Sequence, residues 1–189
     1  MKTVSNTGAK SKLNNNTDQT AGEFLVILEQ RLQDLSALSR LPKENPDGVN
    51  FPKYSQFRDM MGECLSFLII IERRIDQIED VRKDKLKQLF DNLEARIWST
   101  LMEGSLSFLS VICEREYLPI GTRHVFVQEI KTLHDADKVL KQEKFQNILE
   151  ESTLEQREKA ELILNEIIDR APELLNLGDP SNLVDEPHS

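Results

Sequence analysis

Apolar residues recur every three or four positions along most of this chain, which is the spacing of helices with one buried side. The first such stretch contains apolar residues at positions 24, 27, 28, 32, 35 and 38. Thr20 and Glu23 fit a capping box, in which two side chains satisfy two free backbone N–H groups. We therefore expect the first helix to begin at Thr20 and to end before 42–54, a stretch with three prolines and a glycine that we expect to be a loop.

A second helical pattern begins near Ser55 and contains the most apolar block of the chain. Between Leu65 and Ile71 only Ser66 is polar. A helix that is apolar on every side is buried on every side. The block therefore predicts either the central helix of the fold or a self-association interface.

Neither Pro nor Gly interrupts the chain from Glu63 to Glu103. One unbroken helix of that length would span about 60 Å and would be typical of a coiled-coil-like dimer. A compact domain needs a turn, and the charged residues 80–84 are the place where we expect it. Gly104 lies inside the next helical pattern and indicates a close helix crossing or a kink.

Two more helices are expected after Gly121. The first extends from Thr122 to Leu149, and the second begins with a capping box at Ser152 and ends or kinks at Pro172. The sequence thus predicts an all-α fold, a compact bundle or short helical array of about five to six helices. We expect one domain over 20–177, with a disordered tail at 1–19 and a flexible acidic tail at 178–189.

Three strings of the sequence resemble one another. They read FLVILEQR at 24–31, FLIIIERR at 67–74 and FLSVICER at 108–115, and they start 43 and then 41 residues apart. That spacing is in the range of two-helix repeats of the HEAT type. The segments between the strings differ, however, so we interpret them as three core-facing helix segments that end in solvated, local Glu/Arg pairs.

Composition and charge narrow the class of protein. The 189 residues suffice for one core, and the net charge of −9 disfavours binding to nucleic acid. Cys64 and Cys113 fall in apolar helical runs and are expected to be reduced core thiols. No secretory signal is recognisable, and Cys64–Ile71 is too short an apolar block to span a membrane, so we expect a soluble cytoplasmic protein.

The sequence carries no strong catalytic or metal-binding motif. The usual signatures for phosphate binding, acyl transfer and zinc are absent, and so is the Glu-x-x-His of di-iron bundles, so no cofactor is expected. His134 shares a predicted helix face with Asp137 and Lys138. We interpret it as a surface histidine in local charge pairs, with a phosphoacceptor or a metal half-site as the alternatives.

Function follows from these features only as a hypothesis. The surplus of apolar helix surface favours a non-enzymatic protein interaction module, such as an adaptor, a scaffold, a chaperone-like binder or a regulatory subunit, with self-association as one mode. The alternatives are a signalling bundle that uses His134 and a HEAT-like repeat that binds RNA or peptide. The predicted interaction surface comprises an apolar set and a stripe of lysines: Leu65, Phe67, Leu68, Phe108 and Leu109, with Lys138, Lys141 and Lys144.

Overall fold

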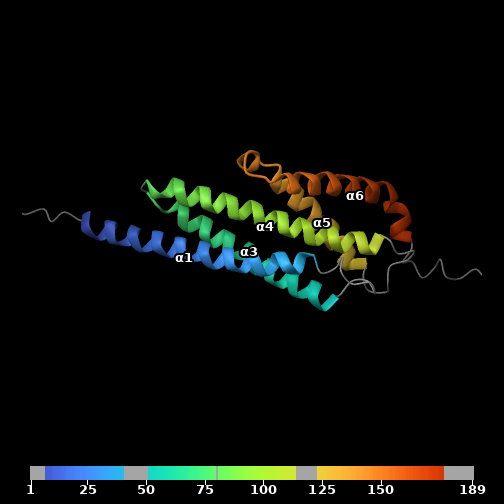
Figure 1. Cartoon of the computed structure of the whole chain (residues 1–189), viewed down its shortest axis with the longest axis horizontal. Helices are drawn as coiled ribbons and strands as arrows, with labels where there is room; N and C mark the ends of the chain where they lie inside the picture. Colours follow the sequence, from blue (N-terminus) through green and yellow to red (C-terminus); the bar gives the residue numbers. More distant parts are fainter. Residues whose placement is uncertain (1–6, 41–50, 80, 114–122, 177–189) are drawn as a thin grey trace, which may run out of the picture.

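The computed structural model describes residues 7–40, 51–79, 81–113 and 123–176, and over these residues the chain is helical without strands. The elements are α1 (Thr7–Ser39), α3 (Phe51–Asp76), α4 (Arg82–Cys113), α5 (Arg123–Leu140), the 3₁₀ turn η1 (Glu143–Phe145) and α6 (Glu151–Asn176). The predicted all-α class is confirmed. Successive helices alternate in direction, so the fold is an up-and-down array (Figure 1).

Helix α4 lies at the centre of this array. It packs against α1 and α3 on one side and against α5, η1 and α6 on the other (Figure 1). Of the two alternatives for residues 64–71, the central helix is wrong, because α4 lies at the centre and α3 leaves Ile69 and Ile70 exposed, whereas the self-association interface stays a prediction. An apolar composition does not by itself decide which faces of a helix find neighbours.

The core follows the helical period of each element. Every turn or so, one or two side chains point inward, and those of Leu28, Ile71, Ile97 and Phe108 are fully buried. They form one continuous cluster that extends from α1 through α4 to α5 and α6. Such a cluster is what holds an array of single-stripe helices together.

Several helix boundaries differ from those expected. Helix α1 begins at Thr7 instead of Thr20. A helix that is already formed can extend at little cost per residue, because each added residue gains a backbone hydrogen bond. Helix α3 begins at Phe51, because Pro52 is tolerated in a first turn whose N–H groups need no partner. Residues 42–50 of the expected loop lie outside the described residues, and its residues 51–54 belong to α3 instead.

The break expected at 80–84 is confirmed but lies a few residues earlier, since α3 ends at Asp76 and α4 begins at Arg82. The helix expected over 122–149 instead ends at Leu140, where Gln142 N–H bonds to the Val139 carbonyl in a tight turn. The chain then buries Phe145 in η1. Helix α6 begins at Glu151, one residue before the expected cap at Ser152, and continues past Pro172.

Gly104 marks a close approach of α4 to α3, as its position in a helical pattern predicts. A Cβ atom placed on Gly104 would overlap the ring of Phe57, which is itself fully buried. Glycine therefore allows the two helices to approach within the thickness of one aromatic ring.

Several ion pairs connect different helices instead of neighbouring residues. Arg96 on α4 bonds both carboxylate oxygens of Glu29 on α1 at 2.7 Å, and Lys144 on η1 lies 2.6 Å from Glu94. Arg31 on α1 pairs with Glu63 on α3, and Lys87 on α4 lies 3.3 Å from Glu72. The local pairs expected in the first two strings, Glu29–Arg31 and Glu72–Arg74, are thus wrong, and the pair expected in the third, Glu114–Arg115, lies outside the described residues. Helical spacing shows which charges are neighbours in sequence but not which helix lies opposite.

Candidate interaction surface

Two of the three similar strings have the same environment position by position. We call them the paired segments, residues 24–31 of α1 and 67–74 of α3. At their second positions Leu25 and Leu68 are buried, and at their fifth positions Leu28 and Ile71 are fully buried. The third string differs, because Phe108 is fully buried whereas Phe24 and Phe67 are half-buried.

Reciprocal contacts join the paired segments. The rings of Phe24 and Phe67 meet edge to face, with centroids 5.9 Å apart and planes at 85°. The guanidinium of Arg31 lies 5.7 Å from the centroid of Phe67, and that of Arg74 lies 4.9 Å from the centroid of Phe24. Arg31 and Arg74 occupy the same position in their segments, so the contacts are related by a local two-fold axis. Each such aromatic or cation–π contact contributes about 0.5–1.5 kcal/mol.

This local symmetry argues against a HEAT-type repeat. In a solenoid, equivalent helices of successive repeats stack in the same direction. The paired segments instead lie on α1 and α3, which run in opposite directions (Figure 1). The 43-residue spacing therefore reflects one antiparallel helix pair.

The outer side of this pair exposes four aliphatic side chains. Val26 is 71% exposed and Ile27 44%, and the equivalent residues Ile69 and Ile70 are 54% and 45% exposed. Ile27 lies three residues after Phe24, and Ile70 three after Phe67, so each shares a helix flank with its aromatic residue. We call these four residues together with Phe24 and Phe67 the paired-segment face. It is the kind of apolar patch that commonly marks a binding site.

The predicted apolar interaction residues are only partly at the surface. Leu65 and Phe67 are half-buried, Leu68 is buried, and Phe108 and Leu109 are fully buried in the core. Phe108 and Leu109 are thus core residues and not part of an accessible surface.

Four residues of the paired-segment face were not predicted from the sequence as part of an interaction surface. These are Val26, Ile27, Ile69 and Ile70. The sequence pattern that could have identified them is the run of five apolar residues at 24–28 and at 67–71. One buried helix stripe needs only about two apolar residues per turn, so the remaining ones must lie outside the stripe.

The three predicted lysines do not form a stripe, because α5 ends at Leu140. Lys138 is exposed on α5, whereas Lys141 follows the helix and pairs with Asp137 at 2.6 Å and with Glu161. Lys144 faces α4 and lies 4.6 Å from the ring centroid of Phe145. Hydrogen bonds to Asp137 and Glu161 raise the pKa of Lys141. Two of the three lysines therefore join elements of the fold.

His134 is exposed on α5, with Nδ1 3.5 Å from the carboxylate of Asp135. The expected pairing with Asp137 is wrong, because the Asp137 carboxylate is buried against Arg157 and Lys141. Among the residues that the structure describes, no group of three or more potential metal ligands occurs.

A buried polar cluster joins α3, α4 and α5. Glu129 is only 2% exposed, and it accepts a 2.9 Å hydrogen bond from the hydroxyl of Ser105. Arg58 Nε lies 3.4 Å from the other Glu129 oxygen, and Arg58 also donates to Thr132 at 3.2 Å. The sequence signal was the position of Glu129, three residues after Phe126 on the buried side of α5.

The Tyr54 hydroxyl is buried next to this cluster. Burial and the charge of Glu129 raise the pKa of Tyr54 well above its usual value of 10.0. The phenol therefore stays protonated in the folded chain at a pH where it ionises in the unfolded chain. This contribution to stability is complete below pH 10 and is lost as the pH rises above it, by about 1.4 kcal/mol per pH unit.

We expect Tyr54→Phe to remove this alkaline dependence. Urea unfolding at several pH values between about 9 and 11 measures it, because other groups titrate equally in both proteins. The free energy of unfolding of wild type should fall more steeply above pH 10 than that of the variant. Parallel curves would show that Tyr54 ionises in the folded state.

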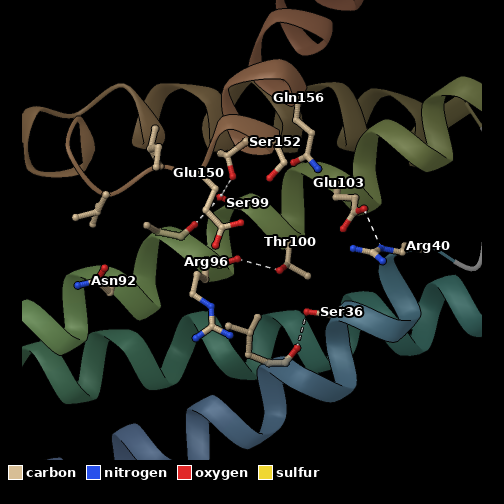
Figure 2. Close-up of a pocket in the computed structure, with 15 residues that line it drawn as sticks. Ser36, Arg40, Asn92, Arg96, Ser99, Thr100, Glu103, Glu150, Ser152 and Gln156 are labelled. Atoms are coloured by element: carbon tan, nitrogen blue, oxygen red, sulfur yellow. Dashed lines mark hydrogen bonds and ion pairs between the residues drawn. The ribbon is translucent and has the colours of Figure 1, made fainter.

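A polar groove of about 460 Å³ lies between α1, α4 and the start of α6 (Figure 2). Most of its polar groups bond to one another or to their own helix. Thr153 donates to Ser99 at 3.1 Å, and Glu103 accepts from Ser39 at 2.9 Å and from Arg40 at 3.2 Å. The groove therefore mainly connects three helices, although the buried Oε1 of Gln156, which lines it, has no hydrogen-bond partner.

Cys64 is a free, fully buried thiol, as expected, and burial raises its pKa. The side chain of Cys113 lies outside the described part. None of the described helices has a stretch that is both long and apolar enough to span a membrane.

Comparisons of the chain with models of protein families, with curated proteins and with solved structures found no match.

Proposed function

We propose that this chain is a protein interaction module, and that it binds its partner through the paired-segment face. The observation that supports the proposal is the exposure of Val26, Ile27, Ile69 and Ile70 at equivalent positions of one antiparallel helix pair. Single exposed aliphatic residues are ordinary on soluble proteins, whereas a cluster on one face is a typical binding site.

The rigidity of the face adds to the argument. The side chains stand on two long helices, and the ring contact of Phe24 with Phe67 and the arginines above the rings hold the helices together. A preformed face loses little conformational entropy when it binds. An apolar centre bordered by charged residues is also the usual composition of an interface.

We expect Ile27→Ser/Ile70→Ser to abolish binding while the fold is retained, because both side chains are already half in water. A matched control is Leu162→Ser on α6, which removes another exposed aliphatic side chain, 70% exposed, outside the face. Circular dichroism verifies the fold of each variant. Wild type and each variant are immobilised on beads as baits, and the proteins that they recover measure heterologous binding. Light scattering of each purified protein measures self-association.

The proposal predicts that wild type and the Leu162 variant recover the same partner, or self-associate equally, and that the double variant does neither. If the double variant behaves like wild type in both assays, the paired-segment face is not the binding site.

A further inference from the structure

We propose that the partner of the paired-segment face is a second copy of this chain, bound about a two-fold axis that crosses α3 near Leu68. This inference rests on the proposed function and names the partner of the same face. It is carried by the distribution of charge around the apolar patch.

Charges of opposite sign border the two ends of the face. At one end Arg73 and Arg74 follow Ile70 after Ile71 and Glu72, and the Glu72 carboxylate lies 3.3 Å from Lys87 of α4. At the other end are Asp59 on α3 and Asp34 on α1, which lie at the same end because Arg31 of α1 contacts Glu63 of α3. Arg73, Asp34 and Asp59 are exposed, and none of them forms an ion pair within the described ranges of the chain.

Only an antiparallel partner satisfies this distribution. The apolar part of α3 is centred near Leu68, with Arg73 about 8 Å beyond it and Asp59 about 13 Å before it at 1.5 Å per residue. A two-fold axis in the plane of the face and perpendicular to α3 places α3 against α3 of the second copy in the opposite direction. Arg73 of each copy then lies level with Glu63 of the other, and Asp59 is about 6 Å further along α3, within reach of a long side chain.

The same two-fold rotation also brings the charged residues of α1 opposite charges of the other sign. On α1 it places Asp34 of one copy near the Arg74 end of the other. A second copy in the parallel orientation would instead place arginine on arginine and aspartate on aspartate. The two-fold arrangement is also closed, because each copy uses the same face and no face remains for a third.

The aliphatic side chains match as well. Ile69 and Ile70 of one copy lie over the Ser66–Phe67 region of the other, and Val26 and Ile27 meet their counterparts on α1. The interface becomes a four-helix bundle in which all four helices contribute the same kind of segment. The net charge of −9 opposes association, but at physiological salt repulsion is screened beyond about 8 Å while the contacts in the interface remain.

A charge exchange between two variants of the full chain tests the geometry. Arg73→Glu makes both ends of the face acidic, and Asp34→Lys/Asp59→Lys makes both ends basic. Each variant alone should dimerise at least about tenfold more weakly than wild type, because like charges meet at both ends. An equimolar mixture should recover the dimer, since every acidic end then meets a basic end. Lys138→Glu on α5 is the control for a charge reversal outside the face.

Sedimentation velocity over a wide concentration range gives the dissociation constants, and circular dichroism verifies that each variant is folded. Wild type and Lys138→Glu should dimerise equally. A wild type that stays monomeric overturns the inference, and so does a mixture that associates no better than its components. If wild type is monomeric but recovers another protein that Ile27→Ser/Ile70→Ser does not, the second copy is ruled out while the proposed function stands.

Discussion

Arg58→Met should lower the free energy of unfolding by about 3–5 kcal/mol, the usual cost of removing one partner of a buried ion pair. Arg58 is the cation that faces Glu129, 3.4 Å from its carboxylate, and the carboxylate is buried between three helices. Methionine keeps most of the volume of the arginine stem, so the loss reports on the charge. Urea unfolding of both proteins at neutral pH measures it.

The control for this prediction is a second substitution in the same cluster. Glu129→Gln keeps an oxygen that can accept the hydrogen bond from Ser105 but removes the charge. In the Arg58→Met background it should recover a large part of the lost stability, because no uncompensated charge then remains. If the double variant is less stable than Arg58→Met by the full cost of Glu129→Gln alone, the two side chains are not coupled.

Gly104→Ala should destabilise the chain by about 1–3 kcal/mol, although alanine is the better helix former by about 1 kcal/mol. The added methyl group would overlap the ring of Phe57, which is fully buried, so that a neighbouring group must shift. Helices α3 and α4 must then separate or the ring must leave its preferred rotamer. Thermal and urea unfolding measure the loss.

Gly62 offers a matched control in α3, because a Cβ atom there would meet nothing within 4 Å. Gly62→Ala should stabilise the chain by about 0.5–1 kcal/mol. Replacing Phe57 by the smaller leucine should relieve the clash. The double variant Phe57→Leu/Gly104→Ala should therefore lose less free energy of unfolding than the sum of the losses of the two single variants. Stabilisation by Gly104→Ala would contradict the close crossing.

The sequence predicts those features of this fold that depend on neighbouring residues. The helical class, the turn before Arg82 and the close crossing at Gly104 follow from periodicity, from a run of charges and from one glycine in a helix. Each is decided within a few turns of chain. The end of α5 at Leu140 was missed because no Pro or Gly marks it, and the burial of Phe145 decides it instead.

The features that were missed depend on which helix lies opposite which. Glu29 could pair with Arg31 on its own helix but pairs with Arg96, 67 positions away. Phe67 and Phe108 occupy the same position of similar strings, yet the first is half-buried and the second is in the core, because α4 is covered on both sides and α3 is not. The local pattern determines the stripe of a helix, whereas its burial depends on tertiary neighbours.

The central place of α4 has a consequence for the order in which the chain is made. Synthesis completes α1 and α3 before α4, and N-terminal units fold first. Until α4 emerges, the helix pair would be apolar on its inner side, at Leu28 and Ile71, as well as on its outer side, at Ile27 and Ile70. We therefore expect a nascent chain that ends before Arg82 to be the species most prone to aggregate and most in need of a chaperone.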